Sequence, residues 1–100
     1  MDSEKNELLK EVKDYLKITW DDEITNSNIQ KSIDEGKYRL QKLIGLEINF
    51  DKDLDSRSLL KDYCRYSREN ALEYFEENFQ STILEIQLHY AIQQNNDWFL

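Results

Sequence analysis

The chain has 100 residues, of which 39% are hydrophobic and 34% are charged, with no proline and two glycines. A chain of this length builds a single, thin core, and so few backbone breakers favour long helices over a sandwich of short strands. We therefore predict one all-α domain.

The charge is distributed unevenly along the chain. The formal net charge is -8, and residues 1–68 hold all 13 basic residues and 15 of the 21 acidic ones, whereas residues 69–100 hold six acids and no Lys or Arg. Such a surface repels phosphate, which disfavours direct binding to nucleic acid or to a membrane surface. We also expect neither a membrane span nor a secretory leader, because no apolar run is long enough and the start MDSEKNE is polar.

Apolar residues three and four apart predict the first two helices. The first covers residues 3–17, with Ser3 as its N-cap. A β-branched and aromatic stretch then interrupts the pattern, and Asp21 and Asp22 offer capping oxygens to a second helix over residues 22–44.

Two glycines mark the second helix. Gly45 stands where a left-handed C-cap is expected. Gly36 lies on the apolar stripe, where it costs about 1 kcal/mol relative to Ala, so we expect another backbone to approach closely there. Tyr38 lies away from the stripe, as an ordinary surface residue or as a partner contact.

Residues 46–54 form the predicted connector, in which Ile48 and Phe50 tuck against the core. A third helix is predicted over residues 56–78, capped by one of two acids, Asp53 or Asp55. Its second half is apolar on two faces, as expected of a central helix or of one that also packs on a neighbouring subunit.

The last part of the chain is ambiguous. Residues 79–92 show both helical spacing and strict alternation, and we expect a helix. A polar spacer and the aromatic end Trp98, Phe99 and Leu100 follow, as a docking peptide or as a tail folded onto the core. The predicted architecture is a small bundle of about four helices (residues 1–92), with an extended loop between helices two and three, and a C-terminal tail (residues 93–100).

No catalytic, cofactor or metal site is expected. The chain has one histidine, His89, and one cysteine, Cys64, so zinc-ligand spacing and an internal disulfide are excluded within one chain, and we interpret both residues as structural. The adjacent carboxylates Asp21/Asp22 and Glu76/Glu77 fit caps and solvated surface, because no calcium-type loop surrounds them. No glycine-rich phosphate loop or serine elbow occurs, so the chain is not expected to be an enzyme.

One charge pattern is a candidate subunit interface. Basic residues four, four and three apart form a predicted ridge on helix three: Arg57, Lys61, Arg65 and Arg68. By the same helical spacing, acidic residues form an adjacent predicted ridge: Asp62, Glu69, Glu73 and Glu76. Ridges of opposite charge can pair between identical subunits in a head-to-tail ring. The alternative is an ordinary solvent-facing helix.

Taken together, the pattern resembles the head-tail connector proteins of tailed bacteriophages, also called head-completion, adaptor or DNA-packaging proteins. The resemblance covers residues 8–92 approximately. It is carried by VKDYLKITWDDEI (Val12 to Ile24), by the stripe of Ile29, Ile33 and Gly36 that closes at LIG, and by LLKDYCRYSRENALEYFEENF (Leu59 to Phe79). The family commonly has a small alanine where this chain has Gly36.

The resemblance implies a homo-oligomeric ring of twelve subunits at the virion neck, made in the bacterial cytoplasm. Such a ring sits beneath the portal protein, extends the DNA channel without binding DNA specifically, and receives neck or tail-completion proteins. We expect Glu73, Glu76 and Glu77 to face the channel, and Trp98, Phe99 and Leu100 to dock on the portal.

A different class of function stays open. A small acidic helical protein can also mimic DNA and occupy the basic cleft of a nuclease, a repressor or a restriction factor. Competition with DNA for a basic target distinguishes this alternative from a connector. A helical enzyme with a composite site between subunits is a third possibility, for which the sequence suggests no substrate.

Overall fold

The computed structural model describes the backbone of residues 2–99 and the side-chain surroundings of residues 7–93. Within this range the chain is all-α and has no strand. The elements are α1 (Asp2–Tyr15), α2 (Glu23–Ile44), α3 (Leu54–Arg68), a 3₁₀ turn η1 (Leu72–Tyr74), α4 (Phe75–Asn78) and α5 (Gln80–Phe99). The predicted all-α class is confirmed, with five α-helices where about four were expected.

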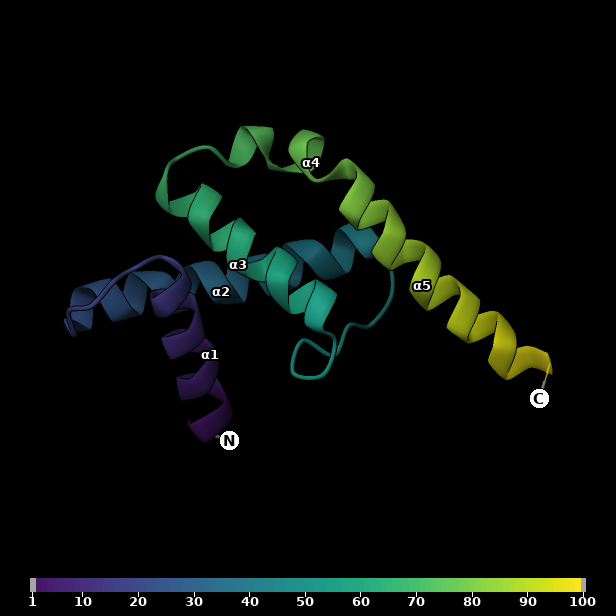
Figure 1. Ribbon diagram of the computed structural model, residues 1–100, viewed down its shortest axis with the longest axis horizontal. Coiled ribbons are helices and arrows are strands. Elements are labelled where there is room, and N and C mark those ends of the chain that lie inside the picture. The colour runs from purple at the N-terminus through teal and green to yellow at the C-terminus, as the bar shows by residue number, and fades with distance from the viewer. Residues whose placement is uncertain (1, 100) are drawn as a thin grey trace.

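Helices α2 and α3 pack together at the centre of the molecule (Figure 1). Helix α1 packs against both of them, and α5 packs against α2, α3 and α4. From there α5 runs outward to the C-terminal end of the chain (Figure 1). One core joins these elements, and its fully buried side chains include Val12, Ile33, Leu40, Leu59, Leu60, Cys64 and Phe75.

Helix α1 begins before the predicted cap Ser3 and ends at Tyr15, two residues earlier than expected, whereas the ends of α2 and the start of α3 follow the predicted caps. The Asp22 side chain accepts a hydrogen bond from the Thr25 N–H (3.0 Å) and caps α2. Gly45 adopts φ 80°, and its N–H donates to the Gln41 carbonyl (2.8 Å), which is the left-handed ending expected of glycine. Asp53 accepts from two N–H groups in the first turn of α3.

Helix α3 is shorter than predicted. The expected helix over residues 56–78 ends at Arg68, so that prediction was wrong. Asn70 adopts a left-handed conformation (φ 57°), and the Ala71 N–H reaches back to the Tyr66 carbonyl (2.8 Å). These are the features of a Schellman ending, in which asparagine replaces the usual glycine.

The segment after this turn folds back onto α3 through aromatic side chains. Phe75 is 2% exposed and lies edge-on to the rings of Tyr63 and Tyr66, with centroids 5.3 and 5.7 Å away. Phe79 also packs edge-on to Tyr66 (5.4 Å). The second apolar face predicted for helix three therefore belongs to a separate segment, which packs against α3 within the same chain.

Gly36 lies in the core against α3, as the sequence indicated. The close neighbours are the side chains of Leu60 and Tyr63, so the expected backbone approach is replaced by a side-chain approach. Tyr38, by contrast, is 64% exposed.

The connector between α2 and α3 contributes to the core. Ile48 and Phe50 are both buried, as predicted, although residues 45–53 form no regular element.

The ambiguous segment over residues 79–92 is helical from Gln80 onward, which confirms the choice of helix over strand. The backbone of α5 continues without a break to Phe99, so residues 93–99 are not a separate extended tail. The side chains of Trp98 and Phe99, and Leu100 as a whole, lie outside the described residues. Among the helices that are described, none has the length and apolarity needed to cross a bilayer.

Candidate assembly surface

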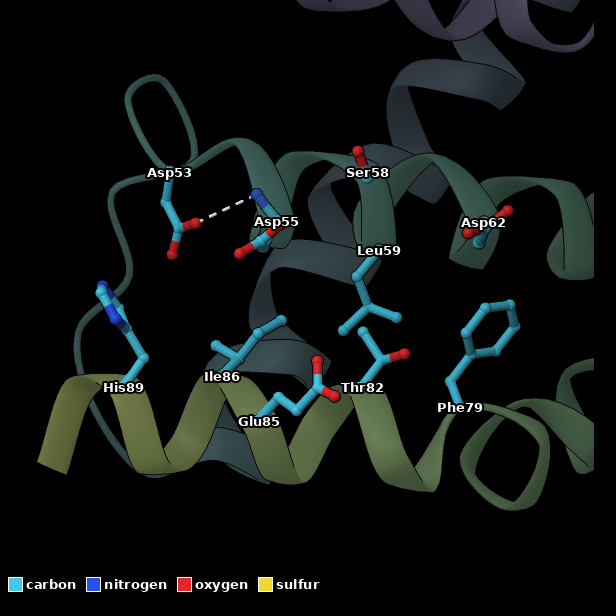
Figure 2. A pocket seen from close by; sticks show the side chains of 10 residues that line it. All are labelled: Asp53, Asp55, Ser58, Leu59, Asp62, Phe79, Thr82, Glu85, Ile86 and His89. Carbon is cyan, nitrogen blue, oxygen red and sulfur yellow. Dashed lines mark hydrogen bonds between the residues drawn. The ribbon is translucent and has the colours of Figure 1, made fainter.

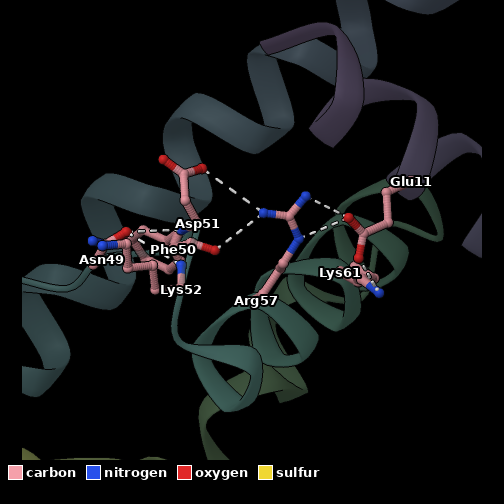
Figure 3. Close-up of polar contacts among 7 residues, drawn as sticks. All are labelled: Glu11, Asn49, Phe50, Asp51, Lys52, Arg57 and Lys61. Carbon is pink, nitrogen blue, oxygen red and sulfur yellow. Dashed lines mark hydrogen bonds and ion pairs between the residues drawn. The ribbon is translucent and has the colours of Figure 1, made fainter. Parts of the chain in front are cut away.

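The basic ridge of α3 begins with a clamp inside the chain (Figure 3). The Arg57 guanidinium donates from Nε to Glu11 Oε2 (2.7 Å), and Lys61 Nζ lies 2.7 Å from Glu11 Oε1. Arg57 also donates to the Phe50 carbonyl (3.3 Å) and lies 3.8 Å from an Asp51 oxygen. Because it joins α1, α3 and the connector, this clamp holds three segments together.

The charges of the clamp are mutually stabilised. The Arg57 side chain is only 14% exposed. Its hydrogen bond to Glu11, helped by Lys61, lowers the pKa of that carboxyl to about 2 against the opposing effect of burial. Arg57 and Lys61 are therefore committed within the chain and present little free charge to a neighbouring subunit.

The next basic residue of the ridge, Arg65, is also paired within the chain, but more loosely, since its side chain is 39% exposed. Arg65 Nη2 lies 3.4 Å from Asp62 Oδ1. The same oxygen accepts a hydrogen bond from the Tyr15 hydroxyl of α1, which raises the pKa of Tyr15. Arg68, the last residue of the ridge, is exposed.

The predicted acidic ridge does not continue along α3, because the helix ends before most of the acidic residues that were assigned to the ridge. Glu69, Glu73, Glu76 and Glu77 are all exposed and lie on the turn, η1 and α4. Glu76 forms an ion pair with Arg39 of α2. The assignment of Arg68, Glu69, Glu73 and Glu76 to a subunit interface stays a prediction. The assignment of Glu73, Glu76 and Glu77 to a channel wall also stays a prediction.

Helix α5 has two apolar faces. On its inner face Ile83 and Ile86 are buried, and the Tyr90 hydroxyl donates to Asp53 Oδ2 (2.6 Å). On the opposite face Leu84, Leu88 and Ile92 are 53%, 54% and 58% exposed. We call these three residues the outer stripe. The alternation that suggested a strand arises because residues of both faces carry even numbers.

A hollow lies along one side of α5, between this helix and α3 (Figure 2). Leu59 and Ile86 point toward each other across it. Its polar lining is dominated by carboxylates from the two helices and the α3 cap: Asp53, Asp55, Asp62 and Glu85. We call it the α3–α5 hollow.

A second hollow lies on the other side of α5, toward α2 and α4. Leu43 and Leu84 contribute apolar lining, and Glu76 and Glu77 contribute carboxylates. Gln87 spans it by donating to the Leu43 carbonyl (2.7 Å). We call it the α4–α5 hollow. No Lys or Arg is among the residues that line either hollow.

Neither Cys64 nor His89 belongs to a reactive cluster. Burial raises the pKa of the Cys64 thiol to about 12, so the group is a neutral part of the core. His89 is exposed at the edge of the α3–α5 hollow. Over the described residues, no three His, Cys, Asp or Glu side chains are grouped so as to hold a metal ion.

Sequence reasoning placed the basic ridge correctly on α3 but missed Glu11 as its partner and missed the outer stripe as a surface. The spacing of Leu84, Leu88 and Ile92 at intervals of four was visible in the sequence. It becomes a surface signal only once Ile83, Ile86 and Tyr90 are assigned to the core.

The chain matches no family model, no curated protein and no solved structure.

Proposed function

We propose that this protein is a structural subunit of a bacteriophage head-tail connector, located at the virion neck, where it forms a homo-oligomeric ring under the portal protein. The observation that carries the proposal is the outer stripe of α5. The inner face of that helix is already packed on the core, yet three large aliphatic side chains remain more than half exposed on the other face. An exposed apolar stripe of this kind is typical of a protein that packs against partners.

The charge of the C-terminal third supports the same role. Glu73 and Glu77 are exposed, and residues 69–93 carry no Lys or Arg. If these acids line a channel, DNA passes without adhering, because the wall repels phosphate.

For the contact between ring subunits, the clamp leaves a smaller set of candidates than the sequence suggested. Arg68 is exposed at the end of α3, Glu69 is exposed in the turn that follows, and Glu73 is exposed on η1. In the proposed head-to-tail ring, Arg68 of one subunit faces these carboxylates on its neighbour, which sets register more than affinity.

Mixing the purified protein with its cognate portal protein tests the proposal. Size-exclusion chromatography with light scattering should give a discrete complex whose mass equals the portal ring plus a whole number of subunits. A mixture that elutes as the two separate components over the micromolar range would contradict a connector role.

The channel assignment has its own test in assembled virions. Reversing Glu73 and Glu77 to Lys should slow DNA ejection, because the wall would then attract phosphate. Glu76→Lys also breaks the ion pair with Arg39, so it is made separately. Unchanged ejection and infectivity in the Glu73/Glu77 double variant would place these acids away from the channel.

The exposed carboxylates also favour a second candidate, an acidic DNA mimic that binds a basic nucleic-acid-binding protein. A mimic displaces DNA from that target in a mobility-shift titration, because both compete for one basic cleft. A connector subunit leaves the protein–DNA complex intact and joins the portal instead.

A further inference from the structure

The outer stripe has the dimensions of a helix-docking site. Leu84, Leu88 and Ile92 lie four residues apart along one side of α5, so they span about 12 Å, or slightly more than two helical turns. Amphipathic helices bind such surfaces through apolar residues spaced three and four apart over a similar length.

Both sides of the stripe are acidic. Glu85 follows Leu84 on α5 and lines the α3–α5 hollow, and Glu77 lines the α4–α5 hollow together with Leu84. These two carboxylates are exposed, and neither has an ion-pair partner among the described residues. Other acids nearby are already engaged, Asp53 by Tyr90 and Glu76 by Arg39.

This charge pattern argues against a second copy of the chain as the occupant. Two α5 helices packed stripe to stripe would bring acidic flanks together without any Lys or Arg on either helix between residues 80 and 93. The basic ridge of another copy is also a poor match, because Arg57, Lys61 and Arg65 are paired within their own subunit, which leaves Arg68 as its one member without an ion pair among the described residues.

We infer that the outer stripe of α5 docks a basic amphipathic helix from a different protein. Leucine-like side chains of that helix cover Leu84, Leu88 and Ile92, and Lys or Arg residues on its two flanks reach Glu85 on one side and Glu77 on the other. The inference rests on the assembly role proposed above, since it states the chemistry of the protein that would bind this subunit at the virion neck.

A synthetic peptide tests this chemistry on the isolated protein. The probe is an 18-residue capped peptide with Leu three and four residues apart and Lys on its flanks, and the matched control peptide has Glu in place of every Lys. Heteronuclear NMR titration should show binding of the Lys peptide alone, with shifts centred on residues 80–93 and on both hollows. Binding should weaken as salt is raised, because the flanking pairs are exposed.

Variants locate the binding. Leu88→Ser should weaken binding of the Lys peptide about tenfold, because it removes a central apolar contact. Glu77→Gln and Glu85→Gln should each weaken it a few-fold. The matched controls are Ile24→Ser and Glu35→Gln on α2, which remove an exposed aliphatic side chain and an exposed carboxylate elsewhere and should leave binding unchanged.

The inference is overturned if the Lys peptide does not bind, if the Glu peptide binds equally well, or if Leu88→Ser has no more effect than Ile24→Ser. Circular dichroism verifies that Leu88→Ser keeps its helical content. This result is separable from the connector role. If the portal complex forms equally well with Leu88→Ser and the peptide does not bind, the docking site is contradicted but the connector role stands. If the peptide binds along α5 but no portal complex forms, the connector role is contradicted.

Discussion

Gly36 in α2 lies directly against the ring of Tyr63 in α3. A Cβ placed on residue 36 would stand 2.8 Å from Tyr63 Cδ1 and 2.7 Å from Leu60 Cδ1. Both neighbours are buried in the core, so a methyl group at residue 36 would have to displace packed side chains. The absence of a side chain at this position is what allows the two central helices to pack so closely.

Replacing Gly36 by Ala should therefore destabilise the protein. Alanine gains about 1 kcal/mol of helix propensity, but overpacking a filled core costs about 1–3 kcal/mol, and the crowding of two buried side chains places the cost at the upper end. We expect a net loss of about 1 kcal/mol or more in urea unfolding, and a larger loss for Gly36→Val. Glu35→Ala, one residue away on the exposed side, is the control. Equal or higher stability of Gly36→Ala would mean that Leu60 and Tyr63 yield easily.

The clamp on Glu11 predicts a pH dependence of stability. The pKa of Glu11 is about 2 in the folded protein, below its ordinary value of 4.5, so the clamp stabilises fully above pH 4.5 and loses its contribution as the pH falls towards 2. Because the carboxylate is one-third exposed, solvent screening limits the contribution to about 1–2 kcal/mol. Glu11→Gln should therefore be less stable than the wild type at pH 7, and the difference should narrow below pH 4.5.

Urea titrations at several pH values measure this difference, with Glu47→Gln on the exposed connector as the control. A gap between Glu11→Gln and the wild type that stays constant from pH 7 to pH 3 would show that the carboxylate charge contributes nothing.

The local rules of the sequence predicted a large part of this fold. The apolar spacing placed Ile29, Ile33 and Leu40 in the core. Capping chemistry narrowed the starts of α2 and α3 to two acids each, of which Asp22 and Asp53 are the caps. These features depend on residues within one or two helical turns of each other, so they can be predicted from local sequence spacing.

The end of α3 could not be predicted in the same way. The residues around Asn70 are compatible with a continuous helix, and helix propensity separates asparagine from good formers by only about 0.5 kcal/mol. The turn is favoured instead by the packing of Phe75 and Phe79 on Tyr66, which requires the chain to reverse. This is a tertiary effect that overrides a weak local preference.

The candidate site was predicted less well than the fold, because its charges depend on distant partners. The spacing of Arg57 and Lys61 placed them on one side of α3 but did not reveal Glu11, which lies 46 residues before Arg57 in the sequence. The outer stripe of α5 likewise emerges only when the contacts of the inner face are known.

Cys64 should be chemically inert in the folded protein. Its side chain is 1% exposed, and burial raises the pKa of the thiol to about 12, so the reactive thiolate is scarce at pH 8. We expect Ellman's reagent to detect no thiol in the native protein and one per chain in guanidinium, since the sequence holds a single cysteine. Rapid labelling of the native protein would mean that the core around α3 opens frequently.

The bond between Tyr90 and Asp53 predicts a measurable coupling between α5 and the start of α3. Burial opposes ionisation of Asp53, but hydrogen bonds from Tyr90, from Ser56 and from backbone N–H groups outweigh it and lower its pKa. Tyr90→Phe should cost about 1 kcal/mol, and Asp53→Ala about 2–3 kcal/mol, because the latter also removes the cap and leaves the buried Ser56 hydroxyl without its acceptor.

A double-mutant cycle in urea isolates this bond from the other roles of the two residues. In the Asp53→Ala background, Tyr90→Phe should have almost no further effect, since the tyrosine hydroxyl has already lost its acceptor there. Tyr74→Phe, at an exposed tyrosine, is the control and should stay within about 0.5 kcal/mol of its parent in either background. If Tyr90→Phe costs the same with and without Asp53, then the bond between the two residues contributes nothing to the packing of α5 on the core.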